Sequence, residues 1–401
     1  MYRKPYTVAI SRMSTSASTP TTVPDIPARP AAYTQAWRDL HWLIHSPDLL
    51  SATAGLPLAA WPATSLPDIA RWLTLEGEAP QVLAADFHTS YRRLGLYAEA
   101  LLGTALQHVD GIQLLAQHTP IHLIVSRGTG AVRQTVGELD YVWRDRDSGQ
   151  VWHWELAVKC YLYLPQTEQA GVVADRFVGL QQRDTLARKT GKLRDQQLRL
   201  SATPEVYRQL GMRIDDAAAY VKGWLFYPLH GNRWDDYLLP ETELSAEAAG
   251  TALLNPRHLR GWWLTHADFV KRLQTTAGVG SPGLRWRILS RMQWLSHHEA
   301  DIADTLDTAA LLAQLQAWFS ADAAPTGQRP GLLIVALAPP GTPASKGTIG
   351  EQAMPDNEPT WQSGATVPIA RKQACTEIHR GFVVANDWAR DAPARRSPMA
   401  T

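Results

Sequence analysis

Cysteine is scarce in this sequence, with only Cys160 and Cys375 among 401 residues. Two cysteines are too few for a disulfide framework or a cysteine-rich zinc site, so we expect a reducing, cytoplasmic location. Long hydrophobic runs are absent as well, because no apolar stretch approaches the roughly 20 residues that span a membrane. The N-terminal stretch lacks the continuous apolar core of a signal peptide. We therefore expect no membrane partner.

An excess of charge of one sign is also missing. The sequence has 39 Lys and Arg against 38 Asp and Glu, which gives a formal net charge of +1. The charge of the whole chain therefore does not favour nucleic acid, and any basic surface must be local. Tryptophan, in contrast, is abundant at 16 residues, and hydrophobic residues make up 45% of the chain. This composition is typical of a globular protein whose cores are anchored by large aromatic side chains.

The length suits two domains or one large domain. We expect a disordered tail over residues 1–32, a first domain over 33–235, a C-terminal region over 250–389 and a polar tail over 390–401. Within the C-terminal region, residues 339–375 are rich in Pro, Gly and Thr and form too long a stretch for an ordinary loop. This composition predicts a disordered insertion.

The first domain mixes helical and strand patterns. Apolar spacing and propensity predict helices around residues 37–44, 90–107 and 178–201, and strands at 121–126, 137–164 (a hairpin) and 219–229. Runs of adjacent strands mixed with helices indicate an α/β (α+β) fold with a mixed sheet flanked by helices. The C-terminal region, with strand patterns at 331–338 and 380–387, is predicted to be a smaller α+β unit.

The hairpin segment carries unexpected charges. In "GELDYVWRDRDSGQVWHWELAVKCYLYL" (residues 137–164), the residues Asp147, Ser148 and Gly149 supply the turn. A turn centred between Asp147 and Ser148 places Asp140 opposite Glu155, with Cβ atoms about 5 Å apart.

Strand alternation adds further charges to this face. Glu138 shares the face of Asp140, and Lys159 shares the face of Glu155. Like charges directly opposite each other destabilise a sheet, and a divalent cation such as Mg²⁺, which prefers oxygen ligands, would offset that cost. The alternative is a solvated face on which Lys159 neutralises one carboxylate.

Two neighbouring segments favour a polar site. Glu99 is the only ionisable residue in residues 94–107, where an isolated carboxylate is costly unless it is paired or points into a polar site. The helix predicted at 178–201 is locally basic and could hold a phosphate backbone, although a solvated helix face is equally consistent with its charges. Its basic residues are Arg183, Arg188, Lys189, Lys192, Arg194 and Arg199.

These segments resemble the PD-(D/E)XK nuclease-like (restriction-endonuclease-like) superfamily. The superfamily core has a helix with a Glu, strands carrying an Asp and then Glu-x-Lys, and a helix that often carries Gln or a basic residue. The corresponding segments are "LGLYAEALL", "GELDYVW", "HWELAVKCYL" and "LQQRDTLARK". The sequence also resembles an uncharacterised bacterial family, domain-of-unknown-function family 1853, in "DLHWLIHSPDLL", "GELDYVW", "HWELAVKCYLYL", "HLRGWW" and "GFVVANDW".

The superfamily resemblance implies roles for individual residues. Asp140 matches the metal-binding Asp, Lys159 the catalytic Lys, and Glu99 the helix Glu. Gln181 or Gln182 matches the position on the helix that follows the hairpin. With the local basicity, this predicts a substrate-binding set of Gln181, Gln182, Arg183, Lys189 and Lys192.

One departure from the superfamily pattern is plain. The acidic residue expected two positions before the lysine is Ala157. Glu155, two positions further back on the same face, is the candidate replacement, and Glu138 is the other. The resulting predicted catalytic set is Asp140, Glu155, Lys159 and Glu99.

The resemblance implies hydrolysis of nucleic-acid phosphodiester bonds, in DNA or RNA, with Mg²⁺ or Mn²⁺. The metal ligands would be Asp140, Glu155 and Glu138, and Lys159 would orient water or stabilise charge on the phosphate. The alternative is a nuclease-like module without catalysis that binds nucleic acid or a protein partner. Ala157 favours this alternative, whereas Asp140 and Lys159 favour the enzyme.

Overall fold

The computed structural model describes residues 34–84, 86–127, 130–165, 173–240, 253–276, 283–320, 329–340, 342 and 374–389. The tails predicted at 1–32 and 390–401 lie outside the described residues. Of the insertion predicted at 339–375, only residues 339, 340, 342, 374 and 375 are described, and the last two belong to a strand.

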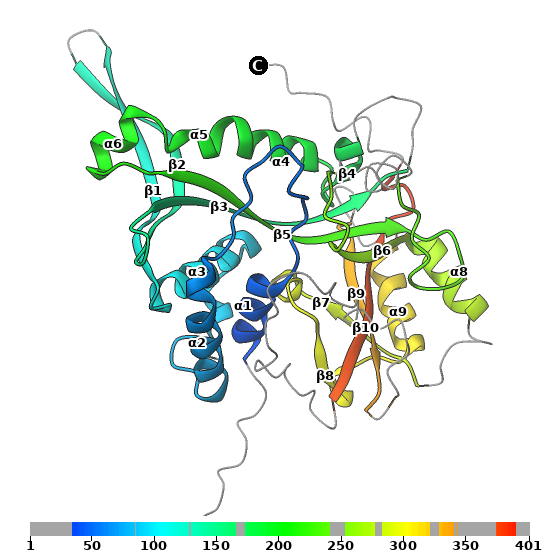
Figure 1. Cartoon of the computed structure of the whole chain (residues 1–401). Coiled ribbons are helices and arrows are strands. Elements are labelled where there is room, and N and C mark those ends of the chain that lie inside the picture. The colour runs from blue at the N-terminus through cyan, green and yellow to red at the C-terminus, as the bar shows by residue number, and fades with distance from the viewer. Residues whose placement is uncertain are drawn as a thin grey trace, which may run out of the picture. The chain divides into compact units, whose positions relative to one another are not determined.

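One mixed sheet runs through the described part of the chain (Figure 1). Its strands follow the order β1 (Ile112–Arg127), β2 (Gly130–Asp145), β3 (Val151–Tyr163), β5 (Asp216–Pro228), β6 (Leu259–Thr265), β10 (Ala374–Val384), β9 (Leu332–Ala338) and β7 (Arg285–Leu289). Two short strands join at the side, β4 (Phe177–Val178) against β3 and β8 (Glu299–Asp301) against β10. Neighbours from β3 to β10 along this order are parallel, and those at both ends of the sheet are antiparallel. The predicted mixed sheet is confirmed.

Strands from both predicted regions lie side by side in this sheet. The boundary predicted between residues 235 and 250 falls between β5 and β6, which pair in parallel from Trp224↔Leu259 to Pro228↔Trp263. Local sequence patterns carry no signal for such a pairing, because the partner strands are separated by a long connection.

Helices cover both faces of the sheet. The α-helices are α1 (Gln35–His45), α2 (Leu66–Glu78), α3 (Leu94–His108), α4 (Leu186–Lys192), α5 (Leu198–Leu200), α6 (Pro204–Leu210), α8 (His266–Thr276) and α9 (Thr308–Phe319). Short 3₁₀ turns are η1 (Ala63–Ser65), η2 (Phe87–Ser90), η3 (Val173–Arg176), η5 (Arg291–Gln293) and η6 (Ile302–Asp304), and η4 (Leu193–Gln197) is a π-helical turn. Helices α1 to α3 lie on one side of β3 and β5, and α4 to α6 lie on the other (Figure 1).

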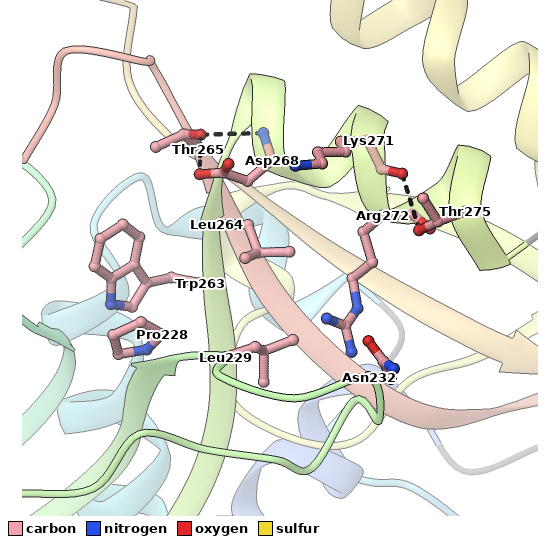
Figure 2. A pocket seen from close by; sticks show the side chains of 10 residues that line it. All are labelled: Pro228, Leu229, Asn232, Trp263, Leu264, Thr265, Asp268, Lys271, Arg272 and Thr275. Carbon is pink, nitrogen blue, oxygen red and sulfur yellow. Dashed lines mark hydrogen bonds between the residues drawn. The ribbon is translucent and has the colours of Figure 1, made fainter.

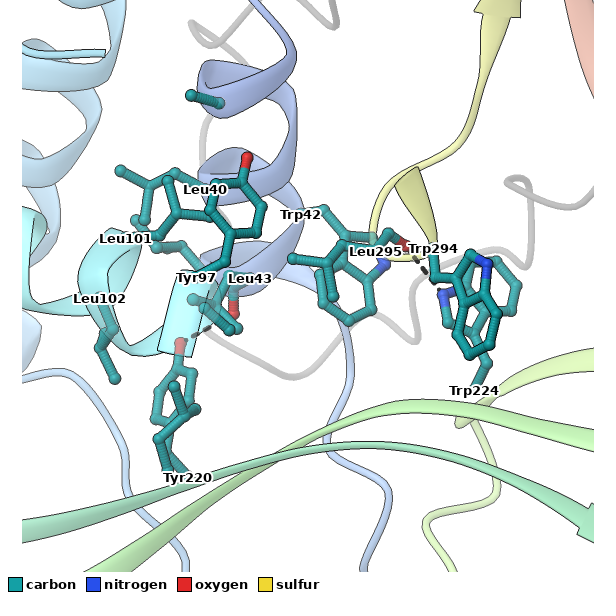
Figure 3. Close-up of a cluster of buried hydrophobic side chains, with 14 of the residues drawn as sticks. Leu40, Trp42, Leu43, Tyr97, Leu101, Leu102, Tyr220, Trp224, Trp294 and Leu295 are labelled. Atoms are coloured by element: carbon teal, nitrogen blue, oxygen red, sulfur yellow. Dashed lines mark hydrogen bonds between the residues drawn. The ribbon is translucent and has the colours of Figure 1, made fainter. Parts of the chain in front are cut away.

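The largest core layer joins α1 and α3 to the middle of the sheet (Figure 3). Helix α1 begins at a Thr34 cap, whose hydroxyl accepts from the Trp37 backbone N–H at 3.1 Å. Its next turns bury Leu40 and Leu43 completely, each contributing about 1.5–3 kcal/mol. Tyr220 of β5 donates to the Leu43 carbonyl at 3.0 Å, which ties the helix end to the sheet.

The helix predicted at 178–201 is shorter than the pattern indicates. It begins at Leu186, because the Thr185 hydroxyl accepts from the Arg188 backbone N–H and caps the first turn. The preceding residues form a turn in which Gln182 has a positive φ of 56°. A capping hydroxyl and a left-handed residue thus override the helical periodicity.

A buried ion pair between Arg380 and Glu377 links β10 to the segment that contains Trp294 and Ser296. Arg380 is 0% exposed, and its Nη2 donates to Glu377 Oε2 at 2.8 Å. The same guanidinium donates to the carbonyls of Trp294 and Ser296 and lies 4.1 Å from the ring centre of Trp224. Every side of the cation is therefore occupied, and the pKa of the Glu377 carboxyl lies below its usual range because the Arg380 charge outweighs burial.

We expect Arg380→Met to destabilise the protein by about 3–5 kcal/mol, because it removes the buried cation that neutralises the Glu377 carboxylate. Urea unfolding followed by tryptophan fluorescence measures the loss. Arg213→Met is the control, since Arg213 is exposed and its replacement should change stability by no more than about 0.5 kcal/mol. Equal unfolding midpoints for the two variants would contradict a structural role for the pair.

Candidate active site

The β2–β3 hairpin has the predicted register. Residues pair from Arg144↔Val151 to Tyr141↔Trp154, so Asp140 and Glu155 are the next residues along the two strands. The turn is closed by Gly149, which has a φ of 75° and donates its N–H to the Asp145 carbonyl. Beyond Tyr141 a side chain replaces the backbone as hydrogen-bond acceptor. The Asp140 Oδ2 accepts from the Leu156 backbone N–H at 2.9 Å.

Asp140 and Glu155 form a carboxyl pair at the end of this ladder. Glu155 is 0% exposed, and its Oε1 lies 2.9 Å from His153 Nε2, within hydrogen-bonding distance. Gln197 of η4 donates to the other Glu155 oxygen. Burial, followed by the charge of Glu155, raises the pKa of Asp140 to about 7. Burial also raises the pKa of Glu155 to about 7, while the charge of Lys189 and hydrogen bonding with Asp140 act in the opposite direction.

Glu99 and Glu138 both lie close to His118, which is near Asp140. The His118 Nδ1 lies 3.7 Å from Glu99 Oε2 and 3.6 Å from Glu138 Oε1. Helix α3 is held at this distance by Tyr141, whose hydroxyl donates to the Glu99 carbonyl at 2.6 Å. Burial and the neighbouring Asp140 charge raise the pKa of Glu99. Glu99, Glu138 and Asp140 therefore lie around His118, whereas Glu155 is not part of the group of ligand atoms that lie within 4.8 Å of one another.

His118 is a site residue that the sequence reading missed. It lies on β1 between the pairs Gln117↔Tyr141 and Thr119↔Leu139, which places it across from Asp140. Its φ of 46° is unusual for a non-glycine residue, and such strain clusters at functional sites. The ligand atoms of His118, Glu138 and Asp140 all lie within 4.8 Å of one another. A lone histidine in a strand pattern gave no signal of this proximity.

Two lysines border the carboxylates, and they differ in their partners. Lys159 Nζ pairs with Asp184 Oδ2 at 2.8 Å, and the Tyr161 hydroxyl donates to the same oxygen. Lys189 Nζ donates instead to Gln197 Oε1 at 3.0 Å. Burial and the charge of Lys159 lower the pKa of Lys189, while Glu155 and Asp140 act in the opposite direction. Lys189 is thus an ammonium that interacts with the carboxyl pair.

The remaining predicted residues lie apart from this cluster. Gln182 is buried, and its amide donates to the Trp388 carbonyl near the end of the described chain. Gln181, Arg183 and Lys192 are exposed to solvent. Ala157 is 3% exposed and belongs to the apolar layer beneath α4, so the position where the superfamily pattern wants a carboxylate is a packing position.

The donor set suits a divalent cation. Carboxylate oxygens are the ligands of Mg²⁺ and Mn²⁺, and an imidazole nitrogen suits transition metals such as Mn²⁺ better than Mg²⁺. Without a cation, the crowded carboxyls must hold protons near neutral pH, as the raised pKa values of Asp140 and Glu155 indicate. A bound cation would release those protons.

A separate cavity of about 420 Å³ lies beside α8, at the ends of β5 and β6 (Figure 2). Leu229 and Leu264 supply apolar walls, and Lys271 and Arg272 lie on the helix above them. The Arg272 guanidinium is engaged by the Gly231 carbonyl, among others. None of the residues that line this cavity belongs to the carboxylate cluster.

Comparison with known proteins gives a family and no closer relative. A family model described as a domain of unknown function (DUF1853) matches residues 38–354. No curated protein and no solved structure matches the chain. Among the described helices, none combines the length and the apolar character that crossing a membrane requires.

The raised pKa values of Asp140 and Glu155 predict a pH dependence of stability in the absence of metal. A carboxyl whose folded pKa of about 7 exceeds its unfolded value stabilises the protein at low pH, and this contribution is lost as pH rises through 7. We expect Asp140→Asn to be more stable than the wild type at pH 8 in EDTA, and the difference to shrink as pH falls toward 5. Thermal unfolding of both proteins over this range measures it. A difference that does not vary with pH would contradict the raised pKa of Asp140.

Proposed function

The chain belongs to the DUF1853 family, whose description names no activity, and from the site we propose that it is a metal-dependent nuclease or related phosphodiesterase. The main observation behind the proposal is that the carboxyl groups of Asp140 and Glu155 lie close together where the β2–β3 pairing ends. Two carboxyls forced together beside further oxygen donors and an ammonium are suited to phosphodiester hydrolysis. The order of strands and helices that bear these residues supports a restriction-endonuclease-like arrangement.

The residues divide into three roles. Asp140, Glu155 and Glu138 would hold Mg²⁺ or Mn²⁺, with Glu99 and His118 completing the donor set. When bound, such a cation polarises a phosphate and acidifies water. Lys189 would stabilise negative charge that develops on the phosphate. Lys159, which is paired with Asp184, would orient a substrate or water at the border of the site.

The exposed basic residues beside the site support a nucleic-acid substrate. Helix α4 and the turns that follow it expose Arg188, Lys192, Arg194 and Arg199, and Arg183 lies just before the helix. Gln197 of the same helical segment contacts Glu155, so this basic surface borders the carboxyl pair. Side chains of this kind position a phosphate backbone without reading its sequence.

We expect the wild type to cleave labelled DNA or RNA oligonucleotides in millimolar Mn²⁺ or Mg²⁺. Asp140→Asn and Lys189→Ala should each lower the rate by about a hundredfold or more, because they remove a ligand and a charge-stabilising group. Lys159→Ala should have a smaller effect, because Asp184 already engages that ammonium. Lys271→Ala, on α8 and distant in sequence, is the control.

Undiminished activity in Asp140→Asn and Lys189→Ala would overturn the assignment. A wild type that binds nucleic acid but takes up no divalent cation in calorimetry would favour the alternative, a catalytically inactive nuclease-like module. The burial of Ala157 is the observation that supports this alternative, since a packed methyl group replaces the expected carboxylate.

His118 predicts a preference for Mn²⁺. Because an imidazole nitrogen contributes more to Mn²⁺ than to Mg²⁺ binding, we expect His118→Ala to weaken Mn²⁺ binding by about tenfold and Mg²⁺ binding much less. Isothermal titration calorimetry of both cations on both proteins measures the selectivity. An equal loss for the two cations would exclude His118 as a ligand.

A further inference from the structure

Lys189, Gln197 and Glu155 form a continuous hydrogen-bonded chain from helix α4 to strand β3. Lys189 donates to the Gln197 amide oxygen at 3.0 Å, and the Gln197 amide nitrogen donates to Glu155 Oε2. The second Glu155 oxygen is held by His153. A single neutral amide therefore joins the ammonium to the buried carboxylate.

The π-helical turn η4 explains how Gln197 reaches this position. Lys189 and Gln197 are eight residues apart, and in a regular α-helix eight residues overshoot two turns by roughly 80°. A π turn accommodates one extra residue, and here the Leu198 N–H bonds to the Leu193 carbonyl, five residues back. The extra residue brings both side chains to the same side of the helix, as their hydrogen bond requires.

The buried residues at both ends of η4 fix this turn in place. Leu193 is 0% exposed and Leu198 is 8% exposed, and both belong to the apolar layer between the helix and the sheet. Between them, Arg194, Asp195 and Gln196 are exposed. The π turn thus exposes the three residues between the leucines to solvent, while both leucines stay packed against the sheet.

We propose that η4 makes Gln197 a positioning residue, which fixes Glu155 and Lys189 relative to each other. With a hydrogen-bond partner on each carboxylate oxygen, Glu155 is held in one orientation, and its remaining lone pairs are left for Asp140 and a cation. Because the amide separates the ammonium from the carboxylate, Lys189 does not close an ion pair that would neutralise the ligand. This inference rests on the proposed function for its purpose, and on the hydrogen bonds for its geometry.

Two adjacent glutamines provide a matched test. We expect Gln197→Leu to weaken Mn²⁺ binding by about 10- to 100-fold in calorimetry, as is typical when a residue that orients a ligand is lost. Gln196→Leu makes the same chemical change on the exposed neighbour and should bind Mn²⁺ like the wild type. Deletion of Gln196, which restores a regular helix and turns Gln197 by about 100°, should reproduce the loss seen in Gln197→Leu. Circular dichroism checks that each variant is folded.

A second readout is independent of metal and of activity. In ¹⁵N-labelled protein, the Gln197 side-chain amide signal is identified by its disappearance in Gln197→Leu. We expect this signal to shift in both Glu155→Gln and Lys189→Met, because each removes one partner of the amide. The Gln196 amide signal should shift in neither.

The outcomes separate the inference from the proposed function. Wild-type affinity for Mn²⁺ in Gln197→Leu, or an equal loss in Gln196→Leu, would overturn the inference. If the wild type binds Mn²⁺, Gln197→Leu weakens that binding and the wild type still cleaves no nucleic acid, the function alone is overturned. If the wild type binds no Mn²⁺, the function fails, and the amide signals decide the inference: an unshifted Gln197 signal overturns it.

Discussion

The parallel pairing of β3 with β5 is the constraint on which the site and the sheet both depend. It runs without interruption from Trp152↔Asp216 to Leu162↔Phe226, so β3 is fixed along nearly its full length. The strands approach so closely at Gly223, which has a φ of 146°, that a Cβ there would lie 1.8 Å from the Lys159 carbonyl oxygen. On one side this pairing orients Glu155 and Lys159. On the other, β5 continues the sheet into β6 and β10.

Because β3 is rigid, the divergence of β2 from it creates the site. The two strands pair only from Arg144↔Val151 to Tyr141↔Trp154, and Asp140 stands where they part. At that point Asp140 binds the Leu156 N–H, and Glu155 is enclosed by His153 and Gln197. Burying two carboxyls costs stability, and these donors offset part of it. A sheet built only for stability would place apolar residues here, so the buried charge supports the function that we propose.

Parts of this arrangement could be predicted from the sequence because they follow from local rules. Turn residues and strand alternation suffice to bring Asp140 beside Glu155. The register that places them there was predicted correctly from the hairpin alone. His118 could not be predicted, since its position depends on the pairing of β1 with β2 and on a left-handed backbone. Gln197 was not assigned to the site either, because helical periodicity gives no sign that one side chain contacts both Lys189 and Glu155 across a π turn.

In the nuclease that we propose, the lysine and the carboxylate would both be displaced from the positions of the superfamily pattern, and the same reasoning explains why. Ala157 lies on the face of Glu155, two residues further along β3, where its methyl group is buried in the apolar layer between α4 and the sheet. Lys159 lies two residues beyond Ala157 on β3, and its ammonium donates to Asp184. A carboxylate at 155 therefore needs an ammonium from another element, and helix α4 supplies Lys189 through Gln197. The motif is thus better described by the positions of its charges in space than by their spacing in the chain.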